Sequence, residues 1–226
     1  MPDSHAFQDL LAKADGEFPH TKASIRFGEH TIEYYRPADP ESALNDEILL
    51  SAHGELEWQP YWAQAWDAGL GMCQHVLDLD LRGKRILDLG CGIGLTSALL
   101  LAVGADLVCG DNAPPSLLFA ELNTWPWRDR VEVKHIDWHT TDLGQTFDTI
   151  VGSDIVYERG EVAPLDRFFR QHLMLGGSVI LSDPSRPMTR DFLERFQQLG
   201  WELLESAIVV EEVRQPIRIV TMKPKA

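Results

Sequence analysis

From residue 83 onwards, short apolar runs alternate with segments whose apolar residues recur at helical spacing. Apolar runs of about four to eight residues between turn residues are typical of buried strands, and spacings of three and four residues are typical of amphipathic helices. The expected strands cover residues 85–89, 106–111, 131–133, 147–152, 177–181, 202–210 and 217–222. The expected helices between them cover residues 95–103, 116–122, 164–173 and 188–199.

This alternation predicts an α/β fold built on one sheet. The strands are expected to be mostly parallel with helices on both faces, because consecutive parallel strands are joined by helical crossovers. The last two apolar runs follow each other without a helix between them. They predict an antiparallel pair at the C-terminal end of the sheet.

The first 57 residues show a different pattern and are interpreted as an N-terminal extension before a domain at residues 58–226. Phe7, Leu10 and Leu11 predict one short helix. Two runs at residues 25–27 and 31–35 flank a Gly-Glu-His turn, which is typical of a β-hairpin. The extension is therefore expected to carry a hairpin that caps the substrate side of the domain.

Three tryptophans precede the regular alternation. Trp58, Trp62 and Trp66 are spaced four residues apart, which places them on one face of a helix. Pro60 suits only the first turn of such a helix. Helical spacing continues through residues 61–77, so this segment is predicted to be helical.

The composition excludes several classes of function. The chain has 226 residues and a net charge of −15, of which −10 falls within residues 1–82. Nucleic-acid binding needs clustered lysine and arginine, and anionic membranes repel acidic surfaces. Three cysteines occur without a CxxC pair, and no basic leader or long apolar segment is found. The prediction is a cytoplasmic protein in a reducing environment, without nucleic-acid or membrane partners.

A glycine-rich loop at residues 87–94 (LDLGCGIG) joins the first expected strand of the sheet to its helix. Glycines there permit a tight turn and let a ligand approach the backbone. The dinucleotide fingerprint G-x-G-x-x-G does not fit, because Leu95 stands where its third glycine would be. Asp88 precedes the loop, and a carboxylate there suits an ammonium group better than a pyrophosphate.

Asp111 ends the second strand, where a carboxylate can accept both hydroxyls of a ribose. A ligand with an ammonium group and a ribose but no phosphates is S-adenosylmethionine (SAM). The sequence therefore predicts a SAM site around Asp88 and Asp111. The alternative is a glycine-rich turn that binds nothing.

Residues 58–222 resemble the seven-β-strand, class I SAM-dependent methyltransferases, through the LDLGCGIG motif and Asp111. The resemblance implies a Rossmann-like seven-stranded sheet and SAM as the cofactor. It also implies that Asp137 bonds the adenine amino group and that Trp138 packs near the ring. The alternative for Trp138 is simple packing. The expected SAM-binding residues are Trp62, Asp88, Gly90, Gly92, Gly94, Asp111, Asn112, Asp137, Trp138 and Ser153.

Three further stretches resemble the family-16 methyltransferases, which modify proteins mostly on lysine. They are PYWAQAW at residues 60–66, SDIVY at 153–157 and SDPSR at 182–186. Together they are similar to the electron-transfer-flavoprotein β-subunit lysine methyltransferases, although residues 1–45 do not match. The resemblance implies that Trp62 covers SAM, with an ordinary core aromatic as the alternative.

The D-x-x-Y motif within SDIVY implies that Asp154 and Tyr157 are catalytic. Asp154 follows the fourth strand and is expected to orient an acceptor amine and stabilise positive charge on it. Tyr157 is expected to shape the channel for a lysine side chain. The alternative for both is helix capping and core packing.

The leading interpretation is a SAM-dependent methyltransferase acting on lysine in a protein with a basic surface. Alternatives are a small-molecule methyltransferase and a non-catalytic SAM-binding regulatory protein, and a histidine or N-terminal amine acceptor also remains open. A nucleic-acid methyltransferase is disfavoured by the charge and by the lack of an N-P-P-[YF/W] motif after the fourth strand. No metal is expected at His135 and His139. The oligomeric state is left open.

Overall fold

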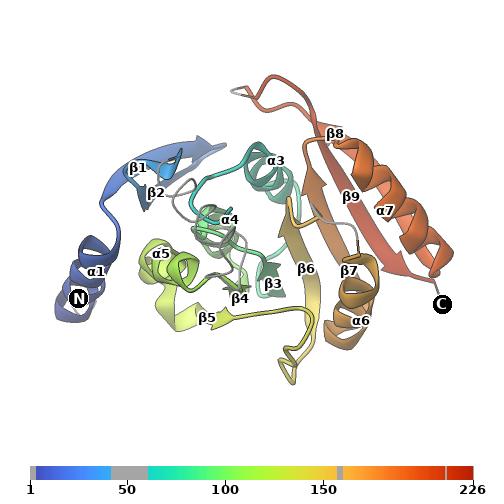
Figure 1. Cartoon of the computed structure of the whole chain (residues 1–226), viewed down its shortest axis with the longest axis horizontal. Coiled ribbons are helices and arrows are strands. Elements are labelled where there is room, and N and C mark those ends of the chain that lie inside the picture. Colours follow the sequence, from blue (N-terminus) through green and yellow to red (C-terminus); the bar gives the residue numbers. More distant parts are fainter. Residues whose placement is uncertain (1–3, 42–60, 157–159, 212, 226) are drawn as a thin grey trace, which may run out of the picture.

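The computed structural model describes residues 4–41, 61–156, 160–211 and 213–225. Its centre is a seven-stranded sheet in the order β5-β4-β3-β6-β7-β9-β8 (Figure 1). The strands from β3 to β7 pair in parallel, and β9 pairs antiparallel with both β7 and β8, which confirms the predicted sheet. The strands are β3 (Arg85–Leu89), β4 (Asp106–Asp111), β5 (Val131–His135), β6 (Phe147–Ser153), β7 (Leu173–Asp183), β8 (Trp201–Ile208) and β9 (Ile217–Pro224).

Helices cover both faces of this sheet, as predicted. One face carries three helices and the other carries two, and a short 3-10 helix follows the third (Figure 1). Within the described segments, no helix combines the length and apolar character that crossing a membrane requires. The helices are α3 (Asp67–Val76), α4 (Leu95–Ala102), α5 (Pro114–Thr124), η1 (Trp125–Arg130), α6 (Val162–His172) and α7 (Pro187–Gln198).

Alternate residues of each central strand point to opposite faces of the sheet, because side chains in a strand have a period of two. Ile86 and Leu107 pack with α3 and α4, whereas Leu87 and Val108 pack with α6 and α7. Each fully buried aliphatic side chain contributes about 1.5–3 kcal/mol. Both faces are covered, which explains why the central strands read as continuous apolar runs.

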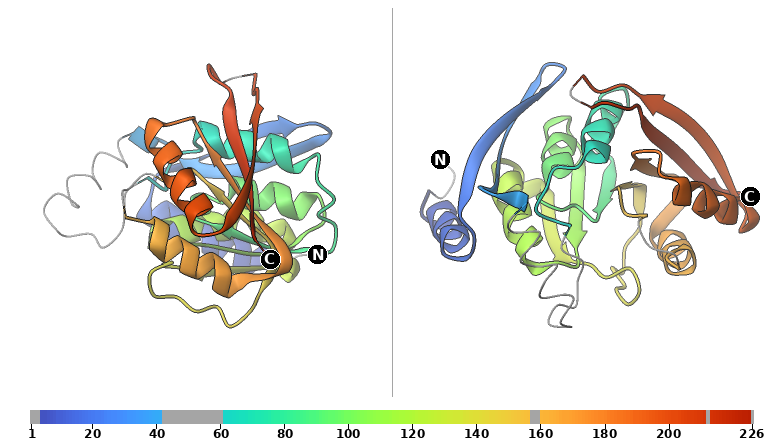
Figure 2. Two further views of the ribbon diagram at one scale, coloured as in Figure 1. Left: turned by 90° about the vertical axis from the view of Figure 1, so that its right-hand side faces the viewer. Right: turned by 45° about the horizontal axis from the view of Figure 1, so that its top comes forward.

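The N-terminal extension forms the predicted short helix and hairpin. The helix is α1 (Ser4–Glu17), and the hairpin consists of β1 (His20–Phe27) and β2 (His30–Pro37), paired antiparallel. Gly28 has a φ of 55° in the turn between the strands. The hairpin contacts α4 and α5, at the opposite side of the molecule from β8 and β9 (Figures 1 and 2).

One buried side chain of α5 connects the hairpin to the glycine-rich loop. Asn123 is 2% exposed. Its Oδ1 accepts the backbone N–H of Tyr35 at 2.6 Å, and its Nδ2 donates to the carbonyl of Tyr35 at 2.8 Å. The same Nδ2 donates to the carbonyl of Ile93 at 2.7 Å. The position of β2 and the end of the loop are therefore set by a single amide group.

The predicted helix from Tyr61 is wrong over its first six residues. Residues 61–63 form a turn, and α3 begins only at Asp67. Trp66 is in the extended conformation and donates its indole N–H to the carbonyl of Tyr61 at 2.8 Å, whereas Trp62 packs on Phe119. These two tryptophans therefore do not share a helical face. Trp58 and Pro60 lie outside the described residues.

We predict that Asn123→Ala destabilises the fold by about 2–4 kcal/mol, because backbone groups of Tyr35 and Ile93 lose their partner in a buried position. Urea unfolding measures the loss, and hydrogen exchange of the Tyr35 amide should accelerate strongly. Glu121→Ala, on the exposed face of the same helix, is the control and should change stability by less than about 0.5 kcal/mol. Equal stability of the two variants would contradict the assignment.

Candidate active site

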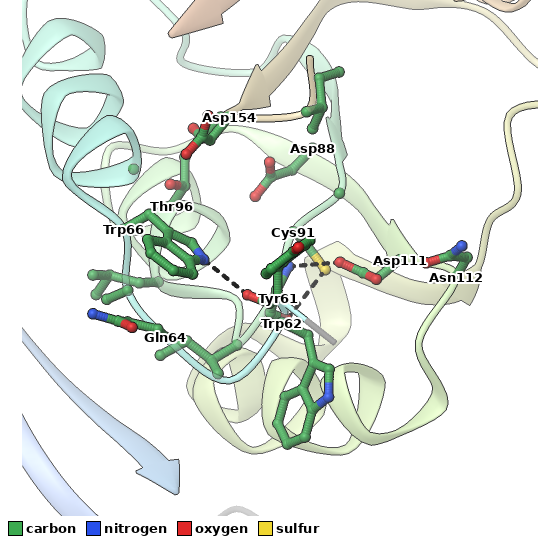
Figure 3. Close-up of a pocket in the computed structure, with 18 of the residues that line it drawn as sticks. Tyr61, Trp62, Gln64, Trp66, Asp88, Cys91, Thr96, Asp111, Asn112 and Asp154 are labelled. Carbon is green, nitrogen blue, oxygen red and sulfur yellow. Dashed lines mark hydrogen bonds between the residues drawn. The ribbon is translucent and has the colours of Figure 1, made fainter. Parts of the chain in front are cut away.

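A cavity of about 390 Å³ opens at the carboxyl ends of β3, β4, β6 and β7 (Figure 3). This volume is within the range of about 300–1,000 Å³ that holds small ligands. In the sheet, β3 has β4 on one side and β6 on the other. The chain therefore reverses its direction of travel across the sheet here, and ligands of open α/β sheets bind at such a switch point.

The structure brings most of the predicted site residues to this cavity, although they come from five separate segments. Of the others, Gly94 lies at the start of α4, Asp137 lies in the turn after β5, and Tyr157 lies outside the described residues. The predicted residues that line the cavity are Trp62, Asp88, Gly90, Gly92, Asp111, Asn112, Trp138, Ser153 and Asp154.

The conformation of the glycine-rich loop favours glycine at all three of its glycine positions, since Gly92 also has a positive φ, of 51°. Gly90 and Gly94 have φ values of 68° and 79°, which side chains disfavour. A Cβ atom on Gly90 would lie 2.7 Å from Cγ2 of Ile155, and one on Gly94 would lie 2.9 Å from Cα of Ala120. The loop therefore turns tightly beneath the cavity and lets α4 pack closely on α5.

Asp88 points into the cavity from the end of β3 and is 1% exposed (Figure 3). Its Oδ2 accepts the hydroxyl of Ser97 at 2.6 Å. Burial raises the pKa of the Asp88 carboxyl to about 7, and the hydrogen bond from Ser97 offsets only part of this effect. A cation placed beside this carboxylate would restore its charge, which makes Asp88 suited to binding an ammonium group.

Asp111 is held by the backbone at the end of β4. Its Oδ2 accepts the N–H of Gly92 at 2.9 Å, and its Oδ1 accepts the N–H of Ala113 at 3.0 Å. Burial raises the pKa of Asp111, and the backbone hydrogen bonds oppose that rise. Each carboxylate oxygen keeps a second lone pair for a ligand hydroxyl. The neighbouring Asn112 lines the cavity on the same side (Figure 3).

Ser153 provides a buried polar atom whose partner is missing from the described part of the chain. Its Oγ is buried beside the cavity and makes no hydrogen bond with any described residue. Buried hydroxyls are almost always satisfied by protein, water or ligand. A water molecule or a polar ligand group in the cavity would satisfy this oxygen.

Of the two residues expected around an adenine ring, Trp138 lines the cavity and Asp137 does not. Trp138 lines the cavity, and its indole N–H donates to Glu161 Oε2 at 2.5 Å. Asp137 accepts the N–H of His139 at 2.9 Å and the hydroxyl of Thr140 at 3.1 Å, so both of its oxygens take part in the local turn. Trp138 is thus in place to face a ligand, whereas the carboxylate of Asp137 stabilises the turn.

Trp62 reaches the cavity mainly from beneath. Its ring packs on Phe18 at 5.2 Å and on Phe119 at 5.6 Å between ring centroids, and the residue is 3% exposed. Figure 3 shows the indole directed towards α5. Tyr61 and Trp66 also line the cavity, and their rings meet edge to face at 6.4 Å between centroids. Sequence spacing alone did not distinguish these roles.

Asp154 lies directly after β6 and forms an ion pair with Arg186, which follows β7. Nη1 of Arg186 donates to Oδ1 at 2.5 Å, and Nη2 donates to Oδ2 at 2.8 Å. Burial raises the pKa of Asp154, and the charge of Arg186 opposes that rise. The prediction of a cavity-lining Asp154 is compatible with this arrangement, but Arg186 was not identified as a site residue. The signal available in the sequence was its place after a neighbouring parallel strand.

The two histidines considered for a metal have other neighbours. The ring Nε2 of His135 lies 3.0 Å from the carbonyl oxygen of Asn112, and Nε2 of His139 lies 3.1 Å from Oε2 of Glu161. Over the part of the chain that the structure describes, no group of three or more potential ligands from histidine, cysteine, aspartate and glutamate is arranged to hold a metal ion.

Comparison with known sequences finds similarity to protein methyltransferases. The family described as lysine methyltransferase matches residues 50–199. Protein N-lysine methyltransferase METTL21A of Danio rerio is 32% identical in an alignment of 144 residues that covers 59% of this chain and 64% of the relative. The electron transfer flavoprotein beta subunit lysine methyltransferase of Mus musculus is 31% identical in an alignment of 139 residues that covers 57% of this chain and 52% of the relative.

Another relative has a different kind of substrate in its name. The tRNA U34 carboxymethyltransferase of Pseudomonas fluorescens strain SBW25 is 30% identical in an alignment of 139 residues that covers 59% of this chain and 40% of the relative. The chain therefore spans less than two thirds of the length of each of these three relatives.

Comparison with solved structures identifies the fold. A TehB-like SAM-dependent methyltransferase from Corynebacterium glutamicum has a TM-score of 0.58 at 20% identity, covering 82% of this chain and 98% of the other. The glycopeptide N-methyltransferase MtfA in complex with SAM has a TM-score of 0.59 at 14% identity, covering 70% and 94%. The chain thus has the fold of SAM-dependent methyltransferases.

The raised pKa of Asp88 generates a prediction about stability. Its folded-state pKa is about 7 against an ordinary value of 3.8, so the folded protein holds a proton that the unfolded chain has lost between these values. The stability contributed by the neutral carboxyl is therefore lost as the pH rises through this window. Asp88→Asn should become more stable than the parent as the pH rises, by about 4 kcal/mol at most. Urea unfolding from pH 4 to 8 measures this difference, and a constant difference would contradict the assignment.

Proposed function

Because the chain belongs to the lysine methyltransferase family, we propose that it transfers a methyl group from SAM to a protein, onto the side-chain nitrogen of lysine. The observation that carries this proposal is the meeting of two sets of groups in one cavity. Asp88 and Asp111 suit the ammonium and ribose of SAM, and Asp154 lies in the same cavity at the switch point of the sheet.

The residues of the cavity fit SAM on three independent points. Asp88 is a buried carboxylate that bonds the neutral Ser97 and is repelled by Asp111, and an ammonium group would stabilise its anion. Asp111 is oriented by two backbone N–H groups and retains lone pairs for ribose hydroxyls. Ser153 offers an unsatisfied hydroxyl. We propose Gly90 and Gly92 as the floor of the site, Gly94 as its support, and Trp62, Asn112, Asp137 and Trp138 as its surroundings.

When bound, SAM supplies a methyl group on a positively charged sulfur, so the protein needs no nucleophile of its own. The task left to the chain is to orient the acceptor nitrogen, whose lone pair must point at the methyl carbon about 3 Å away. Asp154 can accept a charge-assisted hydrogen bond from the acceptor and stabilise the positive charge that develops on nitrogen. A carboxylate also raises the pKa of a nearby amine, so the proposed role is orientation and charge stabilisation.

The cavity also offers apolar surface. Tyr61, Trp66 and Met188 line it, and Tyr61 remains exposed to solvent. We propose that these side chains contact the aliphatic stem of the acceptor lysine, as long apolar stems pack on aromatic surfaces. Tyr157, outside the described residues, keeps its proposed role in shaping the same channel.

A protein is the preferred substrate over RNA, although a tRNA-modifying enzyme is among the relatives. The net charge of −15 favours a basic partner, because phosphate backbones would be repelled. A small-molecule acceptor and SAM binding without turnover are the alternatives. We also propose a cytoplasmic location, supported by the free thiols of Cys73, Cys91 and Cys109.

Labelled SAM tests this proposal directly. We expect the purified protein, incubated with methyl-labelled SAM and a cell lysate, to place label in protein bands, with mass spectrometry locating the methyl groups on lysine. Label confined to RNA or to small molecules would contradict the protein substrate. Absence of transfer together with tight SAM binding would support the non-catalytic alternative.

Asp154→Ala is the matching variant. It should reduce methyl transfer by about a hundredfold or more, because the acceptor loses its orienting group. SAM affinity, measured by calorimetry, should stay within a few-fold, because the proposed contact of Asp154 is with the acceptor and not with SAM. Unchanged turnover in this variant would remove Asp154 from the mechanism.

The acidic N-terminal third leads to a prediction about ionic strength. Residues 1–82 carry −10 of the net charge, so we propose that they attract a basic substrate surface. The second-order rate constant for protein methylation should fall as salt rises from 50 to 500 mM, because salt screens such attraction. Neutralising Asp9, Asp15 and Glu17, which are exposed on α1, should weaken this dependence. SAM affinity is the internal control, and salt-independent methylation would show that the acidity has no role in encounter.

A further inference from the structure

The turn that follows β7 directs one arginine at the acceptor side of the cavity. Asp183 is buried, and its Oδ1 accepts the backbone N–H of Arg186 at 3.0 Å. Its Oδ2 lies 3.8 Å from Nη1 of Arg218 on β9. Ser185, inside the turn, has a φ of 63°. The path of the chain into Arg186 is thus set by a buried carboxylate and not by the arginine itself.

Asp154 is held just as firmly from the neighbouring strand. Its backbone N–H donates to the carbonyl of Ser182 at 2.8 Å, which joins the ends of β6 and β7. Its side chain is 9% exposed, and both of its oxygens accept N–H groups of Arg186. The guanidinium and the carboxylate therefore meet in the two-point geometry that orients both planes.

Backbone strain converges on this pair. Within the described residues, Asp154 and Ser185 are the two residues other than glycine that have a positive φ, at 57° and 63°. Such conformations cost about 1–2 kcal/mol each and persist where the surrounding structure holds them, typically at functional sites. One of these residues carries the carboxylate, and the other immediately precedes the arginine that binds it.

The charges around Asp154 would otherwise favour its neutral form. Burial disfavours the anion, and the carboxylates of Asp183 and Asp67 repel it. Arg186 supplies the opposing positive charge that lowers the pKa of Asp154. A neutral carboxyl would act as a hydrogen-bond donor towards the acceptor nitrogen, and it would lose its attraction for a developing positive charge.

We propose that Arg186 is a positioning residue, which holds Asp154 as an anion with its oxygens aimed at the acceptor nitrogen. This inference rests on the proposed methyl transfer. Each Asp154 oxygen keeps a lone pair after accepting from the guanidinium, so an acceptor N–H can bind while the arginine stays in place. Arg186 then acts through Asp154 and is not displaced by the substrate. The alternative hypothesis is that the guanidinium of Arg186 competes with the acceptor nitrogen for the Asp154 carboxylate.

The first experiment does not depend on a substrate. The pKa of Asp154 is measured by carbon NMR on protein labelled at aspartate carboxyl carbons, with Asp154→Asn identifying the signal. Arg186→Ala should raise this pKa by about one pH unit or more, and Arg186→Lys should restore most of the difference because the charge is kept. Arg190→Ala removes an exposed arginine of α7 and is the matched control, with no expected change. An unchanged pKa in Arg186→Ala would overturn the proposal.

The second experiment measures methyl transfer from labelled SAM to lysate protein across pH. Arg186→Ala should lower transfer between about tenfold and a hundredfold near neutral pH. The acid limb of the pH profile of methyl transfer should move to higher pH in Arg186→Ala, because Asp154 is then protonated at a higher pH. Arg186→Lys should recover the position of the acid limb but only part of the rate, since a lysine ammonium group cannot bind both carboxylate oxygens in the two-point geometry of a guanidinium. Higher transfer by Arg186→Ala would instead show competition and overturn the proposal.

A double variant separates action through Asp154 from general damage. If Arg186 acts through Asp154, the Asp154→Ala and Arg186→Ala changes together should lower transfer no more than Asp154→Ala alone. If the losses of transfer in the two single variants multiply in the double variant, the proposal is overturned. SAM affinity and thermal stability, measured for each variant, show that the site remains folded. If the parent protein transfers no methyl group, the proposed function fails, whereas the NMR titration still decides whether Arg186 keeps Asp154 charged.

Discussion

Burial of carboxylates at the carboxyl edge of the sheet is the constraint on which the site depends. Burial raises the pKa of Asp88, Asp111, Asp154 and Asp183, and each is compensated differently. Asp88 accepts a serine hydroxyl, and Asp111 accepts two backbone N–H groups. Asp154 binds a guanidinium at two points, and Asp183 combines a backbone N–H with an arginine. Asp88, compensated only by neutral groups of Ser97, is the one whose charge best matches a cationic ligand.

The sheet holds these carboxylates close together because parallel strands end at one edge. The strands are buried on both faces, so the edge is rigid and the loops above it can differ between proteins. The family match covers residues 50–199, whereas α1, β1 and β2 precede it. This N-terminal unit is nevertheless joined to the shared core, because Asn123 bonds both Tyr35 and the end of the glycine-rich loop. The N-terminal unit and the glycine-rich loop are therefore held in one fixed relation to each other.

Much of the fold could be predicted from local patterns. Short apolar runs predicted the seven strands and period-3.6 spacing predicted most helices, since burial leaves a direct trace in the order of residues. The glycine-rich loop and the carboxylates at strand ends predicted the cavity, because strand order places these ends together. The Trp62–Trp66 spacing misled for the same reason, since residues four apart share a face only if the segment is helical.

By itself, the sequence determined the strands, the helices and the place of the cavity at one edge of the sheet. The tertiary structure decided which side chains meet there. Arg186 reaches Asp154 across 32 residues, and Asn123 reaches Tyr35 across 88. Periodicity carries no information about such pairs, because it reports which face a residue occupies and not the direction of its side chain across a loop. Those directions follow from turn conformations such as the positive φ of Asp154 and Ser185, which the packed fold imposes.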